Sequence, residues 1–293
     1  MKRHMNIKFL KTKSASLIII FNLLLLGLLP FSCYSQDLYD SEHSRKYAEY
    51  LTSSHQYALA AEEYERLVYF DSGNVNFKNL LIKSYRLSGD LNAGIKRYYS
   101  FYSKTSDTLP GIMAEEFVRL ELLNDSLSVA ERFIQIQKNL SQNKKDVYQT
   151  CTLLINNHYS EADLMVRESK LREPGFPHEI ISITEGALRV KLKSPALAAG
   201  FSILVPGTGK IYTKNWSDGV FAFLFVAGNA WQSYRGFHEH GIKSGIGWAF
   251  AGLSASFYIG NVFGAVKAAK RYNKNKIDDI NRQVFDFVRS DKF

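Results

Sequence analysis

The feature that most constrains the fold is an internal repeat with a period of about 34 residues. The segment 55–67 lies over the segment 89–101, and two weaker copies follow. The recurring positions are Tyr57, Ala60 and Tyr64, then Leu91, Gly94 and Tyr98, then Leu127 and Ala130, and last Tyr159 and Ala162. A unit of this length cannot bury its apolar face alone, so the copies are expected to stack on one another.

An apolar stretch with helical periodicity precedes each copy, which predicts that every unit is a pair of helices. A large residue begins the second helix, and a small residue three positions later lets the first helix approach closely. This pattern resembles the tetratricopeptide repeat. The resemblance implies a solenoid whose concave face binds protein or peptide segments, and an unrelated helical bundle is the alternative. We assign residues 36–170 to the repeats and residues 171–193, which contain Pro174 and Pro177, to a linker and capping helix.

The N-terminus has the layout of a secretory signal peptide. Five basic residues lie in the first thirteen positions, and the short apolar run 17–29 comes after them. We expect residues 1–35 to be removed by cleavage after Ser35. A lipoprotein acylated on Cys33 and an uncleaved signal anchor are the alternatives, and either of them would also export the rest of the chain. Cys151 is then the remaining cysteine, so no internal disulfide is expected.

Residues 194–270 read as a membrane domain. Ser194-Pro195 begins a short apolar helix, and Pro206-Gly207 ends it. A second helix from Ser217 to about residue 237 is roughly 30 Å long, which is one hydrocarbon thickness. After a polar tip at 238–243, a third helix is expected from Gly245 to about residue 269. The pattern predicts a transmembrane hairpin preceded by a half-length helix, and it leaves open whether residues 194–206 also cross.

Small residues recur every four positions along the third helix, at Gly252, Ser256, Gly260, Gly264 and Ala268. Such a ridge lets membrane helices pack closely, and a soluble glycine-rich hairpin is the alternative. Folding the hairpin about residue 240 brings Asn261 level with Gly219. We therefore expect the Asn261 amide to bond the backbone or Asp218, and Asn229 to be the second buried polar side chain.

No catalytic, cofactor-binding or metal-binding residues are assigned. The stretch 207–210 (Gly-Thr-Gly-Lys) lacks the pattern of a phosphate-binding loop, because Leu204 stands where the first glycine belongs and Ile211 replaces the hydroxyl residue. The triplet 238–240 (His-Glu-His) is a weak metal-binding pattern without further ligands nearby. A serine elbow, paired catalytic carboxylates and a Cys-His arrangement are not seen in the sequence.

Several short motifs of the membrane domain occur in a characteristic order. They comprise Pro206, Gly207, Gly209, Tyr212, Asp218, Gly219, Tyr258, Gly260, Asn261, Tyr272 and Asn273. In this order they look like the small two-helix membrane domain of bacterial envelope proteins, which often lies behind tetratricopeptide repeats. The resemblance implies an architecture and brings no established activity or catalytic residue.

We therefore expect an all-α protein with a tetratricopeptide-like solenoid, a membrane hairpin and a basic amphipathic tail at residues 271–293. The tail is expected either to lie on the membrane surface or to return to the repeats. The formal charge of +9 gathers at the two ends of the chain, so nucleic acid is not an expected partner. The leading hypothesis is a non-enzymatic adaptor of the bacterial inner membrane, with periplasmic repeats that bind protein partners, alone or within a homo-oligomer or larger complex. A subunit of a transport or secretion complex is the alternative.

Overall fold

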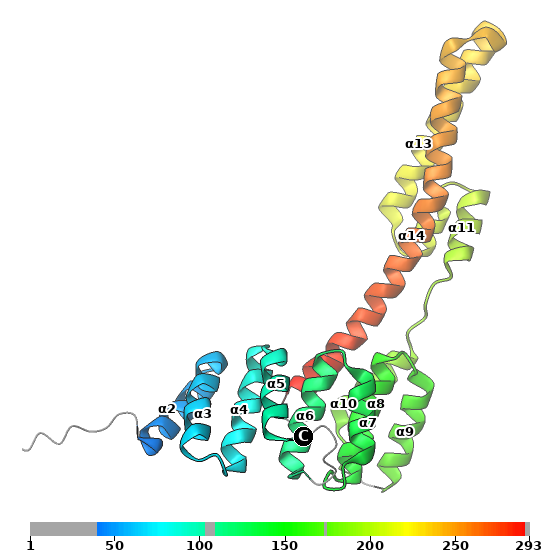
Figure 1. Ribbon diagram of the computed structural model, residues 1–293. Helices are drawn as coiled ribbons and strands as arrows, with labels where there is room; N and C mark the ends of the chain where they lie inside the picture. Colours follow the sequence, from blue (N-terminus) through cyan, green and yellow to red (C-terminus); the bar gives the residue numbers. More distant parts are fainter. Residues whose placement is uncertain (1–39, 103–108, 173–174, 291–293) are drawn as a thin grey trace, which may run out of the picture. The chain divides into compact units, whose positions relative to one another are not determined.

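The computed structural model describes residues 40–102, 109–172 and 175–290, and in these ranges it is all-α, without strands (Figure 1). The predicted signal peptide lies outside the described residues. Residues 45–293 form one unit by their internal contacts.

The first part of the chain consists of successive helix pairs. From α3 to α10, neighbouring helices contact one another in chain order, and α4 with α6 and α8 with α10 also touch. Ala48 and Leu51 of the first helix share a core cluster with α3. The pairs are α2 (Ser41–Ser53) with α3 (Tyr57–Phe70), α4 (Val75–Ser88) with α5 (Leu91–Phe101), α6 (Gly111–Leu123) with α7 (Leu127–Ile136), and α8 (Gln142–Ile155) with α9 (Tyr159–Arg172), followed by the single α10 (His178–Leu188).

The turns within the four pairs share one backbone feature. Each turn has a residue in the left-handed region two positions before the second helix begins, namely His55, Gly89, Asp125 and Asn157. This conformation reverses the chain tightly, and at Gly89 the absence of a side chain makes it free of strain. The large residues expected to open the second helices are their first residues, Tyr57, Leu91, Leu127 and Tyr159.

The small repeat positions lie where the helices approach most closely. Ala60, Ala130 and Ala162 are fully buried, and so are Tyr64 and Tyr98 of the larger positions. A Cβ atom added at Gly94 of α5 would stand 3.1 Å from the Cβ of Tyr85 on α4 and 3.2 Å from a methyl carbon of Leu120 on α6. Gly94 therefore allows α5 to pack against two helices at once.

The second part of the chain contains α11 (Pro195–Leu204), α12 (Thr208–Tyr212), α13 (Trp216–His240), a short 3-10 turn (Gly241–Lys243) and α14 (Gly245–Arg289). Ser194 caps α11, as expected from the sequence, and Ser244 caps α14. The expected end of the last helix near residue 269 is not observed. α14 continues to Arg289 and has 45 residues in all, because residues 265–289 contain neither glycine nor proline to stop it.

By length and composition, α14 is the single helix in the described part that could cross a membrane. Only 11% of its most apolar window is buried, whereas the core helix of a soluble protein would be mostly buried. α13 does not reach that apolar content, because Asn229, Gln232 and Arg235 interrupt its second half.

The last turns of α14 lie among the repeats. Ile280, Val284, Phe287 and Val288 are buried in the same core as the aromatic and aliphatic residues of α6, α8 and α10. Contacts join α14 to each of those three helices. Of the two arrangements expected for the tail, the structure shows the one in which the tail packs against the repeats. The tail continues α14 and is not a separate helix.

Candidate functional site

Three motif glycines hold the helices of residues 195–240 together by close backbone approach. A Cβ atom at Gly209 would stand 1.9 Å from the Ala198 carbonyl oxygen on α11. One at Gly207, whose φ is +93°, would stand 2.0 Å from the carbonyl oxygen of Gly219. Since atoms cannot approach so closely, these positions accept glycine alone without a backbone shift. The glycines thereby join α11, α12 and α13 at one point.

The motif tyrosines and Asn273 fasten the ends of α11. The Tyr258 hydroxyl on α14 donates to the Ile203 carbonyl oxygen at 2.7 Å. The Asn273 side chain brackets the backbone of Lys193, accepting from its N–H at 2.7 Å and donating to its carbonyl oxygen at 2.9 Å. The ring of Tyr212 lies 4.4 Å from the Lys193 ammonium. Tyr272 is half-buried on α14.

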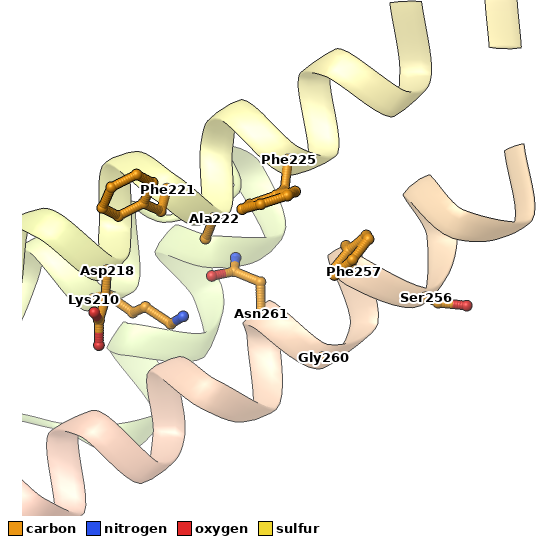
Figure 2. A pocket seen from close by; sticks show the side chains of 9 residues that line it. All are labelled: Lys210, Asp218, Phe221, Ala222, Phe225, Ser256, Phe257, Gly260 and Asn261. Carbon is orange, nitrogen blue, oxygen red and sulfur yellow. The ribbon is translucent and has the colours of Figure 1, made fainter. Parts of the chain in front are cut away.

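A pocket of about 300 Å³ opens between α12, α13 and α14 beside this junction. Lys210 and Asp218 line it together with Asn261, and its walls include Phe221, Phe225 and Phe257 (Figure 2). Its floor is the α14 backbone at Gly260, where no side chain fills the space. A Cβ atom at Gly264 would stand 3.2 Å from the Lys210 Cε atom, so the lysine stem lies directly across α14.

The polar groups of this pocket are not paired with one another. Asp218 accepts a hydrogen bond from the Asn215 amide at 2.7 Å, and in the described part of the chain it has no ion pair with Lys210. Asn261 is 4% exposed, and neither atom of its amide has a hydrogen-bond partner within the described residues. The bond expected from Asn261 to Asp218 or the backbone is therefore absent. Figure 2 shows the Asn261 amide between α13 and α14, next to the end of Lys210.

Asn229 differs from its expectation as well. Its side chain is only half-buried, and its amide donates to the Phe225 carbonyl oxygen one turn earlier on the same helix, at 2.6 Å. An amide satisfied by its own helix needs no partner elsewhere. Asn261 is therefore the buried polar group of the hairpin that lacks a partner among the described residues.

The small-residue ridge does not form the contact between α13 and α14. Gly252, Ser256 and Gly260 are exposed, Gly264 is half-buried, and Ala268 is buried. The two helices meet on an adjacent face, where Ser254 donates to the Val226 carbonyl oxygen at 3.0 Å and Ser233 to that of Gly247 at 2.9 Å. The fourfold spacing predicted a close-packing surface without naming its partner, and that surface stays a prediction.

A second polar cluster fixes the end of α14 in the repeats. Arg86 of α4 forms a two-point ion pair with Glu116 of α6, at 2.7 and 3.0 Å, and donates to the Arg289 carbonyl oxygen at 2.6 Å. Arg119 donates to the Ser290 carbonyl oxygen at 2.7 Å. The two guanidinium groups thus satisfy free carbonyl groups at a helix C-terminus and complement its dipole. We call Arg86 and Arg119 the arginine clamp.

Neighbouring side chains hold the clamp in position. Arg119 donates to the Tyr148 hydroxyl at 2.8 Å, and that hydroxyl donates to Glu115 at 3.0 Å. Burial lowers the pKa of the Arg119 guanidinium, but the nearby Tyr148, Glu116 and Glu115 outweigh this effect and raise it above its ordinary value. Burial also raises the Glu115 pKa, and the Lys144 and Arg119 contacts more than reverse that rise. Both groups are therefore charged at neutral pH. The sequence analysis did not identify this cluster, because its members are spread over about 200 residues with no common spacing.

Comparisons of the chain with protein-family models, with curated proteins and with solved structures give no match.

Proposed function

We propose that the protein is an exported adaptor of the bacterial cell envelope, anchored in the inner membrane and without enzymatic activity. Its tetratricopeptide-like repeats bind a protein partner in the periplasm. The observation that carries this proposal is the continuity of α14. Its first half is apolar and exposed, as a helix in lipid is, and its last turns are buried in the repeat core. A single helix thus connects the anchor with the binding domain.

Side-chain exposure around the hairpin supports placement in lipid. Many large apolar residues on α11, α13 and the first half of α14 face outward, including Leu204, Phe221, Trp231, Trp248 and Phe263. Soluble monomers rarely expose contiguous apolar patches of such extent. Trp231 and Trp248 lie toward the tip of the hairpin, where aromatic residues anchor membrane helices at the interface.

The partner surface that we propose is the first helix pair. The end of α14 already occupies a surface of α6, α8 and α10, so a partner is excluded from that position while α14 is docked. The pair α2 and α3 instead leaves five large apolar side chains exposed, namely Tyr47, Tyr50, Leu59, Tyr69 and Phe70. Tyrosine contributes strongly at protein interfaces because it buries a large area at a small entropic cost.

Photo-crosslinking in living cells tests this assignment. A photoreactive residue at Tyr50 or Tyr69 should give a discrete protein adduct, whereas the same residue at the exposed Lys170 of α9 should give none. The change Tyr47→Asp should remove the adduct while leaving the amount of protein in the membrane unchanged. Adducts that form equally at all three positions, or at none, would contradict the proposed surface.

The alternative, a subunit of a transport or secretion complex, has less structural support. It depends on buried polar groups within the hairpin and on the half-length helix α11. Asn229 is satisfied by its own helix, so Asn261 alone remains as a candidate contact with a transported solute.

A further inference from the structure

The pocket beside Asn261 contains two opposite charges that are held apart. Lys210 reaches it across α14, and Asp218 reaches it from the first turn of α13. Within the described residues, the Lys210 ammonium forms no ion pair or hydrogen bond. Charges near the hydrocarbon region of a bilayer are costly unless they are paired. The pocket is therefore complementary to a ligand that brings one negative and one positive charge of its own.

Asn261 adds a second and independent indication of a ligand. Its amide carries two donors and one acceptor oxygen, and it is 4% exposed with all of them unused within the described residues. Leaving such a group without a partner costs about 1–3 kcal/mol. An amide that lines a pocket between a cation and an anion can donate to the negative group of a ligand and accept from its positive group.

The walls of the pocket indicate what the ligand is attached to. Phe225 and Phe257 stack at 5.4 Å, and together with Phe221 they lead from the polar groups to the exposed apolar surface of the hairpin. The volume of about 300 Å³ is at the small end for ligand pockets and admits a headgroup but not a whole lipid. An occupant with a small polar head and apolar chains would place the chains along this aromatic surface.

We infer that the pocket binds the headgroup of a phosphoethanolamine lipid from the surrounding bilayer. Lys210 and the Asn261 N–H groups bind the phosphate, and Asp218 and the Asn261 oxygen accept from the primary ammonium. A phosphoglycerol headgroup offers Asp218 only neutral hydroxyl groups and would leave that carboxylate without an opposite charge. A choline headgroup has a positive charge but no N–H to donate. This inference rests on the proposed placement of the hairpin in lipid, but not on the proposed protein partner.

Native mass spectrometry of the full-length protein in detergent provides the test, with phosphatidylethanolamine, phosphatidylglycerol and phosphatidylcholine added in competition. The wild-type protein should retain phosphatidylethanolamine preferentially. Lys210→Met should weaken that binding about tenfold or more, since it removes a charge-assisted contact to phosphate. Lys243→Met at the far end of the hairpin is the matched control and should leave it unchanged. Equal retention of the three lipids, or no effect of Lys210→Met, would overturn the inference.

Two further variants separate recognition from folding. Asp218→Asn should abolish the preference for ethanolamine over glycerol while retaining phosphate binding. Asn261→Leu should lose lipid binding and yet unfold at the same or a higher temperature, because it removes an unsatisfied buried amide. A lower unfolding temperature for Asn261→Leu, with lipid binding retained, would show that the amide is structural.

A further binding measurement with a soluble compound tests whether the headgroup comes from the bilayer. It can be made whether or not the hairpin lies in a membrane. Glycerophosphoethanolamine, which has no acyl chains, should bind the same pocket more weakly than the lipid and should compete with it. Binding of the soluble compound at least as tightly as the lipid would overturn the assignment to the bilayer. Failure of the photo-crosslinking experiment would leave the expected result of each of these measurements unchanged.

Discussion

At the scale of single residues, the motif glycines are required by close helix packing and not by a catalytic or binding role. Gly207, Gly209 and Gly219 lie where α11, α12 and α13 meet. The helices approach so closely there that a side chain would not fit between them. The sequence predicted a turn at Pro206-Gly207, and the structure adds that the same glycines create the space for the junction. Spacing alone could not show this, because the groups that the glycines contact come from other helices.

Gly209→Ala should destabilise the hairpin by about 3 kcal/mol or more, since its Cβ atom would overlap the Ala198 carbonyl oxygen at 1.9 Å. Gly228→Ala on α13 is the matched control. Nothing lies within 4 Å of its added Cβ atom, so it should be neutral or stabilising by up to about 1 kcal/mol. Thermal unfolding in detergent measures both variants, and equal unfolding temperatures would contradict the close-approach explanation.

At the scale of helices, α14 differs most from its expectation. The sequence predicted an apolar helix ending near residue 269 and a separate basic amphipathic tail at residues 271–293. Both patterns are present, but the residues where they meet favour helix. Lys274 forms an ion pair with Asp278 one turn later, at 2.8 Å, and nothing there breaks the backbone ladder. A change from an apolar to an amphipathic pattern marks a change of surroundings, and it does not by itself mark a helix end.

Docking of α14 into the repeats can be tested by burying a charge. Val284 is fully buried, so Val284→Asp should release the end of the helix, whereas Gln283→Asp at the exposed neighbouring position should not. Loss of about 3 kcal/mol of docking free energy corresponds to roughly 100-fold faster trypsin cleavage at Arg282. Similar cleavage rates for the two variants would show that the tail contributes little to the fold.

At the scale of the whole molecule, the contact between α14 and the repeats bears on topology. The repeats and the C-terminal end of α14 lie on the same side of any membrane that the hairpin crosses. In the proposed topology, with exported repeats, the basic residues 267–276 face the periplasmic headgroups, contrary to the usual bias of positive charge. The hydrophobic pattern left this arrangement open as one of two alternatives for the tail. The return to the repeats is observed in the buried apolar residues of the tail and in the arginine clamp, whose members come from α4 and α6 and contact the last residues of the described chain.

A reporter fused after Phe293 should therefore show the same compartment as a reporter fused directly before the repeats, at residue 40. If α11 crossed the membrane as a third span, the two reporters would lie on opposite sides. Paired alkaline phosphatase and fluorescent-protein fusions distinguish these results. Opposite compartments would also require that the clamp is not formed in the cell.

The unbroken α14 has a mechanical consequence. Its 45 residues span roughly 68 Å without a joint. With the hairpin in a bilayer, as proposed, a change of tilt imposed by bilayer thickness is transmitted along the helix to the guanidinium groups at its other end. In the proposed membrane placement, one rigid helix therefore couples the bilayer to the helix pairs that hold its C-terminal end.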